Sequence, residues 1–189
     1  MTSYEITDTS TQHIELDHKL EKVGSTKISG FENIWFSCLT NEEVVQYLKE
    51  FQPKQYEKCQ SIHYELLPNL KNPSITSQFN PKSHEITIWS PIVWEKWFTG
   101  KENTKIHILD TIARQVGHNA YENISTSEWK KIHQSQAGFV STNAKNTEIE
   151  DFAESFATYR NDPNLLKFKS PEKYEFMKSQ VFFGKEYTT

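Results

Sequence analysis

The sequence predicts an α+β protein with a small mixed sheet and a helical C-terminal part. Two observations lead to this fold class. Strand-like segments and one helix fill the first half of the chain, and helical patterns fill the second half. The strands do not alternate with helices, as they would in βαβ units. At 189 residues the chain is long enough for one domain with a core of its own.

The first segment, residues 1–28, is polar and Thr-rich and has no sustained periodicity. We expect it to be an arm that precedes a single domain over residues 29–189. The apolar run Glu32–Leu39 predicts a buried strand. Thr40 and Glu43 then have the spacing of a capping box, which predicts a helix up to about Pro53.

Two further strands are expected over Ser61–Leu67 and His84–Trp89, because both segments nearly alternate apolar and polar residues. An Asn/Pro/Ser-rich loop, residues 68–83, separates them. After an aromatic stretch, Ile92–Phe98, Thr104 is placed to cap a long helix that runs to about Asn123.

The remaining elements are expected to be helices. Ser125 and Glu128 have capping-box spacing for a helix to about Gln136, and a loop over residues 138–146 follows. A helix from Thr147 to about Arg160 is expected to stop at Asp162 and Pro163. Ser170 is placed to cap a final helix, with Pro171 at its first position.

Composition argues against several classes of function. The net charge is −4 and no basic stripe is present, so nucleic acid is not an expected partner. The longest apolar runs are too short for a membrane span. The N-terminus lacks the basic start and apolar core of a signal peptide, as in a cytosolic protein, a mature form or a domain of a longer chain. Cys38 and Cys59 have no C-x-x-C spacing, which favours two buried reduced thiols.

The long helix expected to begin at Thr104 has two faces. Its apolar stripe consists of Ile106, Leu109, Ile112, Ala113, Val116 and Ala120. Its polar face consists of His107, Thr111, Arg114, His118 and Glu122, with Gln115 at the edge. The pattern alone predicts a solvated face with the local pairs Asp110–Arg114 and His118–Glu122.

A second helix gives the polar face another interpretation. In residues 147–160 the expected buried stripe is Ile149, Phe152, Ala153 and Phe156. Glu150 and Glu154 then lie one turn apart on its flank. A helix that carries Gly117-His118, followed about thirty residues later by an acidic helix, is the arrangement in which a zincin gathers its third, acidic ligand.

Four segments together resemble the anthrax-lethal-factor-like family of zincin domains, which includes the Pro-Pro endopeptidases. They are ILDTIARQVGHNAY (108–121), FVSTNA (139–144), EIEDFAESFATYRNDP (148–163) and SPEKYEFMKSQVF (170–182). The resemblance covers about Leu109–Phe182 and implies a zincin-like fold with an active-site-type helix. It also implies that His118 matches the second histidine of H-E-x-x-H, that Glu150 matches the acidic zinc ligand, and that Glu154 matches a supporting carboxylate.

Three residues depart from the family pattern. Arg114 stands in place of the first histidine, Gln115 in place of the glutamate, and Asn143 in place of a tyrosine. A guanidinium has no lone pair for a metal, and an amide cannot take a proton from water, a step typically worth about 10²- to 10⁴-fold in rate. We therefore expect a degenerate copy without zinc, a pseudoenzyme that binds a protein partner or peptide segment. Arg114 is expected to pair with Glu150 or Glu154.

Alternatives remain open at the level of sequence. One is a working zinc peptidase with an unusual ligand set, in which His118 and Glu150 are the most plausible ligands and His107 or His133 supplies a third. Others are an active enzyme inactivated by substitution, or a structural α+β domain unrelated to the family. The resemblance suggests a secreted or toxin-associated protein, and the aromatics of residues 90–98 are one candidate partner surface.

Overall fold

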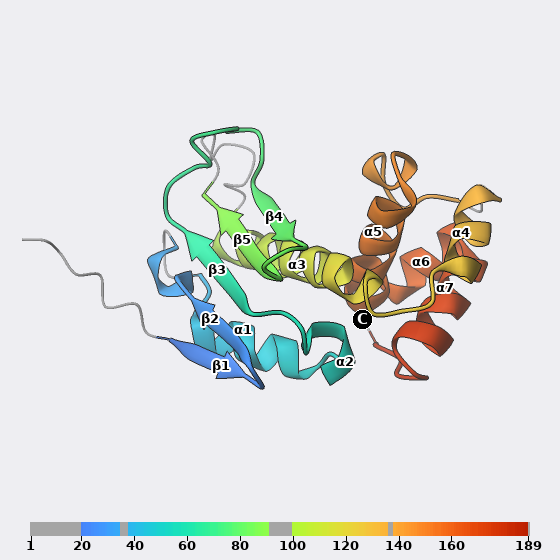
Figure 1. Ribbon diagram of the computed structural model, residues 1–189, viewed down its shortest axis with the longest axis horizontal. Coiled ribbons are helices and arrows are strands. Elements are labelled where there is room, and N and C mark those ends of the chain that lie inside the picture. Colours follow the sequence, from blue (N-terminus) through green and yellow to red (C-terminus); the bar gives the residue numbers. More distant parts are fainter. Residues whose placement is uncertain (1–19, 35–37, 91–99, 136–137, 189) are drawn as a thin grey trace, which may run out of the picture.

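A long central helix joins a five-stranded sheet to a group of C-terminal helices (Figure 1). This computed structural model describes residues 20–34, 38–90, 100–135 and 138–188. The strands and the first helices precede the central helix in the chain, and the remaining helices follow it. The fold therefore belongs to the α+β class that the order of elements predicted.

The sheet is mixed, with the strand order β1-β2-β3-β5-β4. Its strands are β1 (Glu21–Val23), β2 (Thr26–Ser29), β3 (Ser61–Glu65), β4 (Ser77–Asn80) and β5 (Glu85–Trp89). β3 is parallel to both of its neighbours, β2 and β5. β1 is antiparallel to β2, and β4 is antiparallel to β5. In the part of the chain that the structure describes, β4 is consequently an edge strand.

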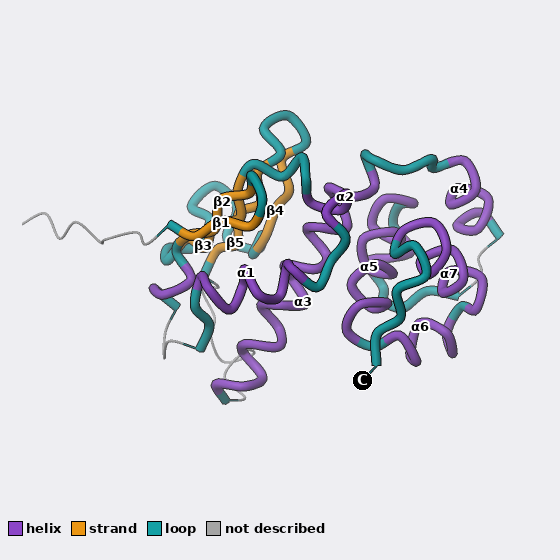
Figure 2. The backbone as a smooth tube through the Cα atoms, turned by 90° about the horizontal axis from the view of Figure 1, so that it is seen from below, coloured by secondary structure: helices purple, strands orange, loops and turns teal. Residues whose placement is uncertain are grey.

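Burial alternates along the strands, so only one face of the sheet is apolar. Ile62 and Ile86, for example, are fully buried, whereas their strand neighbours are partly exposed. α1 and α3 lie on the same side of the strands (Figure 2). The α-helices are α1 (Asn41–Lys49), α2 (Pro53–Tyr56), α3 (Lys101–Tyr121), α4 (Ser127–Gln134), α5 (Glu148–Asn161), α6 (Pro163–Lys169) and α7 (Pro171–Phe176). A π-helical turn, Met177–Val181, continues α7.

Several expected helix boundaries are confirmed by the caps. Thr40 and Glu43 form the capping box of α1. Thr147 caps α5 through the backbone N–H of Glu150, and Ser170 caps α7 immediately before Pro171. These boundaries were predictable because each depends on contacts between residues three apart in the sequence.

The N-terminal part of the sheet differs from expectation. Residues 21–29 form β1 and β2, so the boundary expected after residue 28 lies too late in the chain. Thr26 is fully buried and its hydroxyl donates to the carbonyl of Cys59, 2.9 Å away, a contact that only tertiary folding provides. The strand expected over Glu32–Leu39 is also wrong: Phe31–Asn33 is a 3₁₀ turn, and Cys38 and Leu39 are buried without strand pairing. Residues 35–37 of that segment lie outside the described residues.

Other expected boundaries need correction. The segment predicted to be a loop, residues 68–83, contains β4, which forms by antiparallel pairing with β5. α3 begins at Lys101, three residues before the expected cap, and the Thr104 hydroxyl donates instead to the Gly100 carbonyl. α4 has Thr126 at its N-cap with no side-chain cap bond, rather than a Ser125–Glu128 capping box. After α5 the chain forms α6, because Asp162 caps this new helix. The aromatic stretch at residues 92–98 lies outside the described residues.

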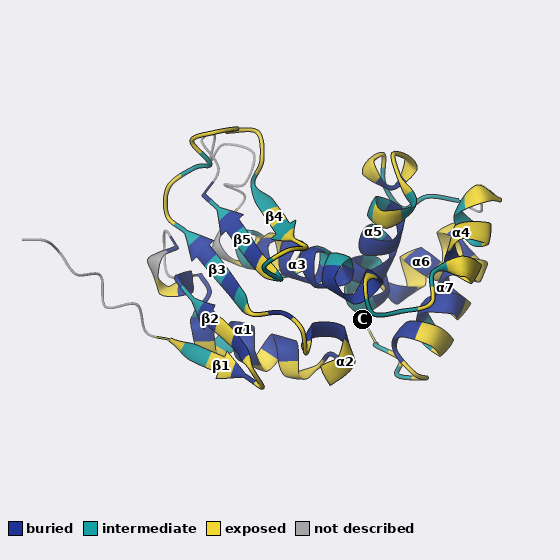
Figure 3. Cartoon of the chain, viewed as in Figure 1, coloured by how far each residue is buried: buried dark blue, intermediate teal, exposed yellow. Residues whose placement is uncertain are grey.

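α3 and α5 cross at Gly117. A Cβ atom at this position would lie 3.0 Å from the Cα of Ala153 and 3.1 Å from the Cβ of Phe156, so the glycine permits the close approach. Ala153 and Phe156 are fully buried, and the crossing lies among buried residues (Figure 3). Gly117 thus brings the two helices that carry the candidate site residues into contact.

The expected apolar stripes are correct except at their ends. Ile106 is 56% exposed in the first turns of α3, and Ile149 is 43% exposed in the first turn of α5. On α3 the buried surface is broader than one stripe, because the helix packs against both the sheet and α5. Thr111 and Gln115, which were assigned to a solvated face, are each only 4% exposed.

Cys38 and Cys59 are both buried, and neither is in a disulfide in the described part of the chain, as expected. Burial raises the pKa of the Cys59 thiol to about 12, so this thiol is protonated at neutral pH. Within residues 20–188, apart from the segments that are not described, no helix has the length and apolarity needed to cross a membrane.

Candidate functional site

A pocket of about 400 Å³ lies between the edge strand β4, the second half of α3 and the start of α5. From β4 and the turn after it, Ser77, Gln78, Phe79 and Pro81 line the pocket; from α3 and its C-cap, Arg114, Gln115, His118, Tyr121 and Glu122; and from α5 and its cap, Thr147, Ile149 and Glu150. Four of the six residues that the sequence assigned to a degenerate cleft therefore line one pocket. The other two, Asn143 and Glu154, contact each other.

Arg114 lies between the sheet and α5. Its Nη1 atom is 3.6 Å from the Glu154 carboxylate, and its Nη2 atom donates a 3.1 Å hydrogen bond to the Ser77 hydroxyl. Both partners of the ion pair are largely buried, with side chains 22% and 18% exposed. The expected pairing of Arg114 with a carboxylate of the second helix is thus present, and Glu154 provides it.

The electrostatics of Glu154 reflect this position. Burial raises the pKa of its carboxyl group, while the positive charge of Arg114 and a side-chain hydrogen bond with Asn143 act in the opposite direction. The net pKa remains above the usual value. Arg114 therefore offsets only part of the cost of burying this carboxylate.

Gln115 also contacts the sheet. Its side-chain N–H donates to the same Ser77 hydroxyl at 2.9 Å. Because Gln115 is almost fully buried, this contact fixes its amide between α3 and β4. Gln115 therefore joins a helix to the edge strand.

His118 lies next to Glu150, with 3.7 Å between Nε2 and Oε2. Burial lowers the pKa of the imidazole and Arg114 lowers it further, while Glu150 partly raises it. The net pKa is below the ordinary value of 6.5, so His118 is neutral at pH 7 and does not neutralise Glu150.

The local pairs that the pattern of α3 predicted are not formed. Arg114 pairs with Glu154 rather than Asp110, and His118 contacts Glu150 rather than Glu122. Glu122 instead lies 3.8 Å from the Nδ1 atom of His84, at the turn between β4 and β5. The polar face of α3 thus contacts α5 and the sheet because both pack directly against it.

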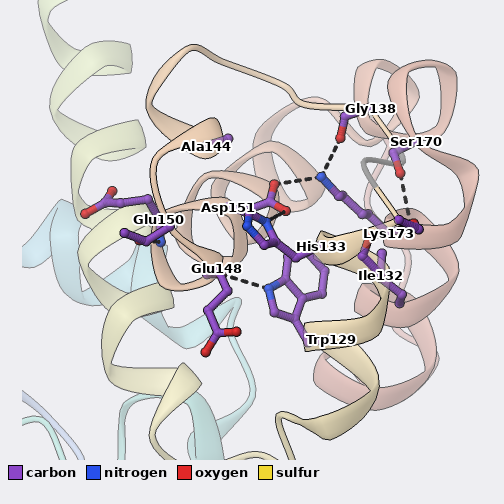
Figure 4. Close-up of polar contacts among 12 residues, drawn as sticks. Trp129, Ile132, His133, Gly138, Ala144, Glu148, Glu150, Asp151, Ser170 and Lys173 are labelled. Carbon is purple, nitrogen blue, oxygen red and sulfur yellow. Dashed lines mark hydrogen bonds and ion pairs between the residues drawn. The ribbon is translucent and has the colours of Figure 1, made fainter.

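On its other side, α5 is anchored by a buried polar cluster around Asp151 (Figure 4). The carboxylate of Asp151 accepts from Lys173 Nζ at 2.7 Å and contacts His133 Nδ1 at 2.9 Å. Lys173 also donates to the carbonyl of Gly138, and both Asp151 and Lys173 are fully buried. This Asp151 cluster holds α4, α5, α7 and the start of the 138–146 loop together, so it fixes the segment that carries Asn143 and Glu150.

A zinc ion of the kind that the family resemblance implies does not fit this set of residues. Arg114 occupies the position that faces Glu154 and carries a permanent charge, which repels a cation and provides no lone pair. His133, one of the possible third ligands, contacts Asp151, whereas the Glu150 side chain extends from the opposite side of α5 (Figure 4). His107 is about 16 Å along α3 from His118 at a rise of about 1.5 Å per residue. Among the described residues, no three His, Cys, Asp or Glu side chains are grouped so that they could hold a metal.

The contribution of β4 to the pocket was not predictable from the sequence. Ser77 and Phe79 belong to a four-residue strand within an Asn/Pro-rich segment that reads as a loop. Ile149 was assigned to the core, but it lines the pocket instead. Only the turn residues at Asn80-Pro81, placed just before the His84–Trp89 strand, could have suggested a hairpin here.

The edge of β4 carries main-chain groups that have no hydrogen-bond partner among the described residues. The Trp89 N–H donates to the Thr76 carbonyl, so Thr76 and Trp89 are a hydrogen-bonded pair of the antiparallel ladder. Such pairs alternate with non-bonded ones. The main-chain N–H and C=O groups of Ser77 and Phe79 therefore point away from β5, on the side where the described part of the sheet has no further strand.

The geometry thus defines an acidic cleft beside a strand edge that no other described strand covers, and the cleft is built from this edge strand and two crossing helices. Comparison of the chain with protein-family models, curated proteins and solved structures found no match.

Proposed function

We propose that this protein is a catalytically degenerate, metallopeptidase-like domain that binds an extended peptide segment of a protein partner in the pocket between β4, α3 and α5. The observation that carries the proposal is the position of Arg114 and Gln115. In an H-E-x-x-H frame these positions would hold a zinc ligand and a general base. Here both side chains donate to Ser77 on the edge strand, and Arg114 also pairs with Glu154.

The free edge of β4 supports an extended peptide as the occupant. An extended segment can add to an exposed sheet edge through main-chain hydrogen bonds, while side pockets supply specificity. The outward N–H and C=O groups of Ser77 and Phe79 have no partner within the described ranges and can make such pairs. The exposed side chain of Ile149 gives the pocket an apolar contact on the opposite wall.

The charge of the pocket favours a peptide with a basic side chain. Glu122 and Glu150 line the pocket, and His118 is neutral at pH 7. The single guanidinium, that of Arg114, already pairs with Glu154. A lysine or arginine of the peptide would therefore find an uncompensated carboxylate at Glu150.

Selection from a random peptide library on the immobilised full chain tests the proposal. We expect the selected peptides to contain a basic residue within a β-prone segment. Glu150→Gln should weaken their binding, measured by calorimetry, while the same change at the exposed Glu57 should not.

A second pair of variants tests the strand edge. Phe79→Pro removes an outward N–H that β5 does not use, a position at which an edge strand tolerates proline. It should weaken binding more than Phe79→Ala, which removes only the ring. Recovery of no peptide, or of peptides whose binding neither Glu150→Gln nor Phe79→Pro alters, would show that this pocket is not a peptide site.

A further inference from the structure

The hydroxyl group of Ser77 receives two hydrogen bonds within the protein. Arg114 Nη2 donates to it at 3.1 Å and Gln115 Nε2 donates at 2.9 Å. A serine hydroxyl has two acceptor lone pairs and one proton. Both lone pairs are therefore occupied, and the proton is the only remaining hydrogen-bonding group of this side chain.

The proton of Ser77 has no acceptor among residues 20–34, 38–90, 100–135 and 138–188. The hydrogen bonds of the Ser77 side chain are the two that it accepts. The carboxylate that shares Arg114 with Ser77, that of Glu154, contacts Arg114 and Asn143. Since Ser77 lines the pocket, its proton is available to a molecule bound there.

The environment makes this proton a strong donor. The guanidinium of Arg114 is permanently charged and donates directly to the oxygen, which withdraws electron density from the O–H bond. The hydroxyl group of Ser77 is thus polarised toward donation by Arg114, which lines the pocket beside it.

The acceptor that fits this donor is a neutral carbonyl oxygen. A carboxylate of the ligand would share the pocket with Glu122 and Glu150, and like charges in such a site repel. An amide carbonyl provides two lone pairs without that repulsion. An extended peptide offers one carbonyl per residue, so it can place one against Ser77 while it crosses the pocket.

We propose that the Ser77 hydroxyl donates a hydrogen bond to one backbone carbonyl of the bound peptide, and that Arg114 and Gln115 orient it for this purpose. The inference rests on the proposed function and specifies how the peptide is positioned at that site. Ser77 is then the residue that sets the register of the peptide against β4.

Thioamide substitution in a selected peptide tests this contact, because sulfur is a much weaker acceptor than oxygen. Each backbone carbonyl of the peptide is replaced in turn and the affinity is measured by calorimetry for the natural chain and for Ser77→Ala. At one position we expect the thioamide to weaken binding about three- to tenfold, the range of a single neutral hydrogen bond. In Ser77→Ala the same thioamide should have no further effect, which is the signature of coupling in a double-mutant cycle.

Two other variants complete the test. Gln115→Glu introduces a side chain that can only accept, so the Ser77 proton turns toward it and the same thioamide should again lose its effect. Ser74→Ala, at an exposed serine whose hydroxyl bonds to Asn72, should leave both the affinity and the thioamide effect unchanged.

The outcomes separate this inference from the proposed function. If a peptide binds and responds to Glu150→Gln and Phe79→Pro, but every thioamide effect is the same in the natural chain and in Ser77→Ala, the role of Ser77 is wrong while the peptide site stands. If Ser77→Ala does not fold, the comparison between the natural chain and Gln115→Glu still decides the question. If no peptide binds at the pocket, the proposed function fails first.

Discussion

At the scale of single residues, the charge of Arg114 compensates a buried carboxylate of the candidate site. A buried carboxylate is costly unless a positive charge or hydrogen bonds compensate it. Glu154 has both, from Arg114 and Asn143, and still keeps a raised pKa because burial dominates. An internal guanidinium thus stabilises a carboxylate between α3 and α5, in the place where the proposed zincin ancestry would put a metal ion.

Replacement of Arg114 by methionine should therefore destabilise the protein in a pH-dependent way. The pKa of Glu154 in the folded state should rise further above its unfolded value, so the loss is present at neutral pH and shrinks as the pH falls and Glu154 becomes protonated. We expect a loss of about 1–3 kcal/mol in the free energy of unfolding at pH 7.5, less than for a fully buried pair. Urea denaturation at pH 7.5 and pH 5 measures it.

The double variant Arg114→Met with Glu154→Gln is the control for this prediction. When the Glu154 carboxylate is absent, Arg114→Met should change the free energy of unfolding by the same amount at pH 7.5 and at pH 5. An Arg114→Met variant that is equally destabilised at both pH values would show that packing, rather than charge, is what Arg114 contributes.

At the scale of elements, two features hold α5 in place: the close crossing with α3 at Gly117 and the Asp151 cluster. Lys173 and Asp151 are both fully buried, so the removal of one partner leaves an uncompensated charge. Lys173→Met should cost about 3–5 kcal/mol in the free energy of unfolding. Thermal and urea unfolding measure this, and a loss well below 1 kcal/mol would contradict the role of the cluster.

A matched control for Lys173 is available on the same part of the chain. Lys178 pairs with Glu186 at the surface, where the two side chains are 33% and 54% exposed. Lys178→Met should leave stability almost unchanged because water already solvates both charges. The paired variant Lys173→Met with Asp151→Asn should recover part of the loss, since it removes the unpaired charge.

At the scale of the whole molecule, the ancestry of the site can be tested by restoration. The combined change Arg114→His, Gln115→Glu and Asn143→Tyr returns the H-E-x-x-H frame next to Glu150. Two histidines one helical turn apart and a nearby carboxylate are the ligands of a catalytic zinc site. We expect the restored chain, purified without chelator, to bind about one zinc per chain by elemental analysis.

The same restored chain with His118→Ala should lose the zinc, which makes it the control. A restored frame that binds no zinc would contradict the placement of the cleft. The natural chain measured in parallel addresses the alternative of a working enzyme with unusual ligands, because about one zinc per chain in it would overturn the proposed pseudoenzyme.

The sequence by itself determined the elements that depend on local spacing. The caps at Thr40, Thr147 and Ser170 each join residues three apart, and the apolar periodicity of α3 and α5 follows from helix geometry. The same spacing placed Glu150 and Glu154 on one flank of α5. We expected Arg114 to pair with one of these two carboxylates because a buried acid needs a positive charge nearby and a guanidinium is permanently charged. Arg114 pairs with Glu154.

Only the tertiary structure decided the rest, because those features depend on contacts between distant segments. β1, β2 and β4 are short strands that are stabilised by hydrogen bonds to neighbouring strands. Their own sequences therefore resemble those of loops. The way α3 crosses α5 beneath the edge of the sheet determines that Arg114 pairs with Glu154 rather than with Glu150. It also determines that Arg114 and Gln115 both donate to Ser77. Local sequence fixes which residues share a face of a helix, whereas packing decides which groups those faces meet.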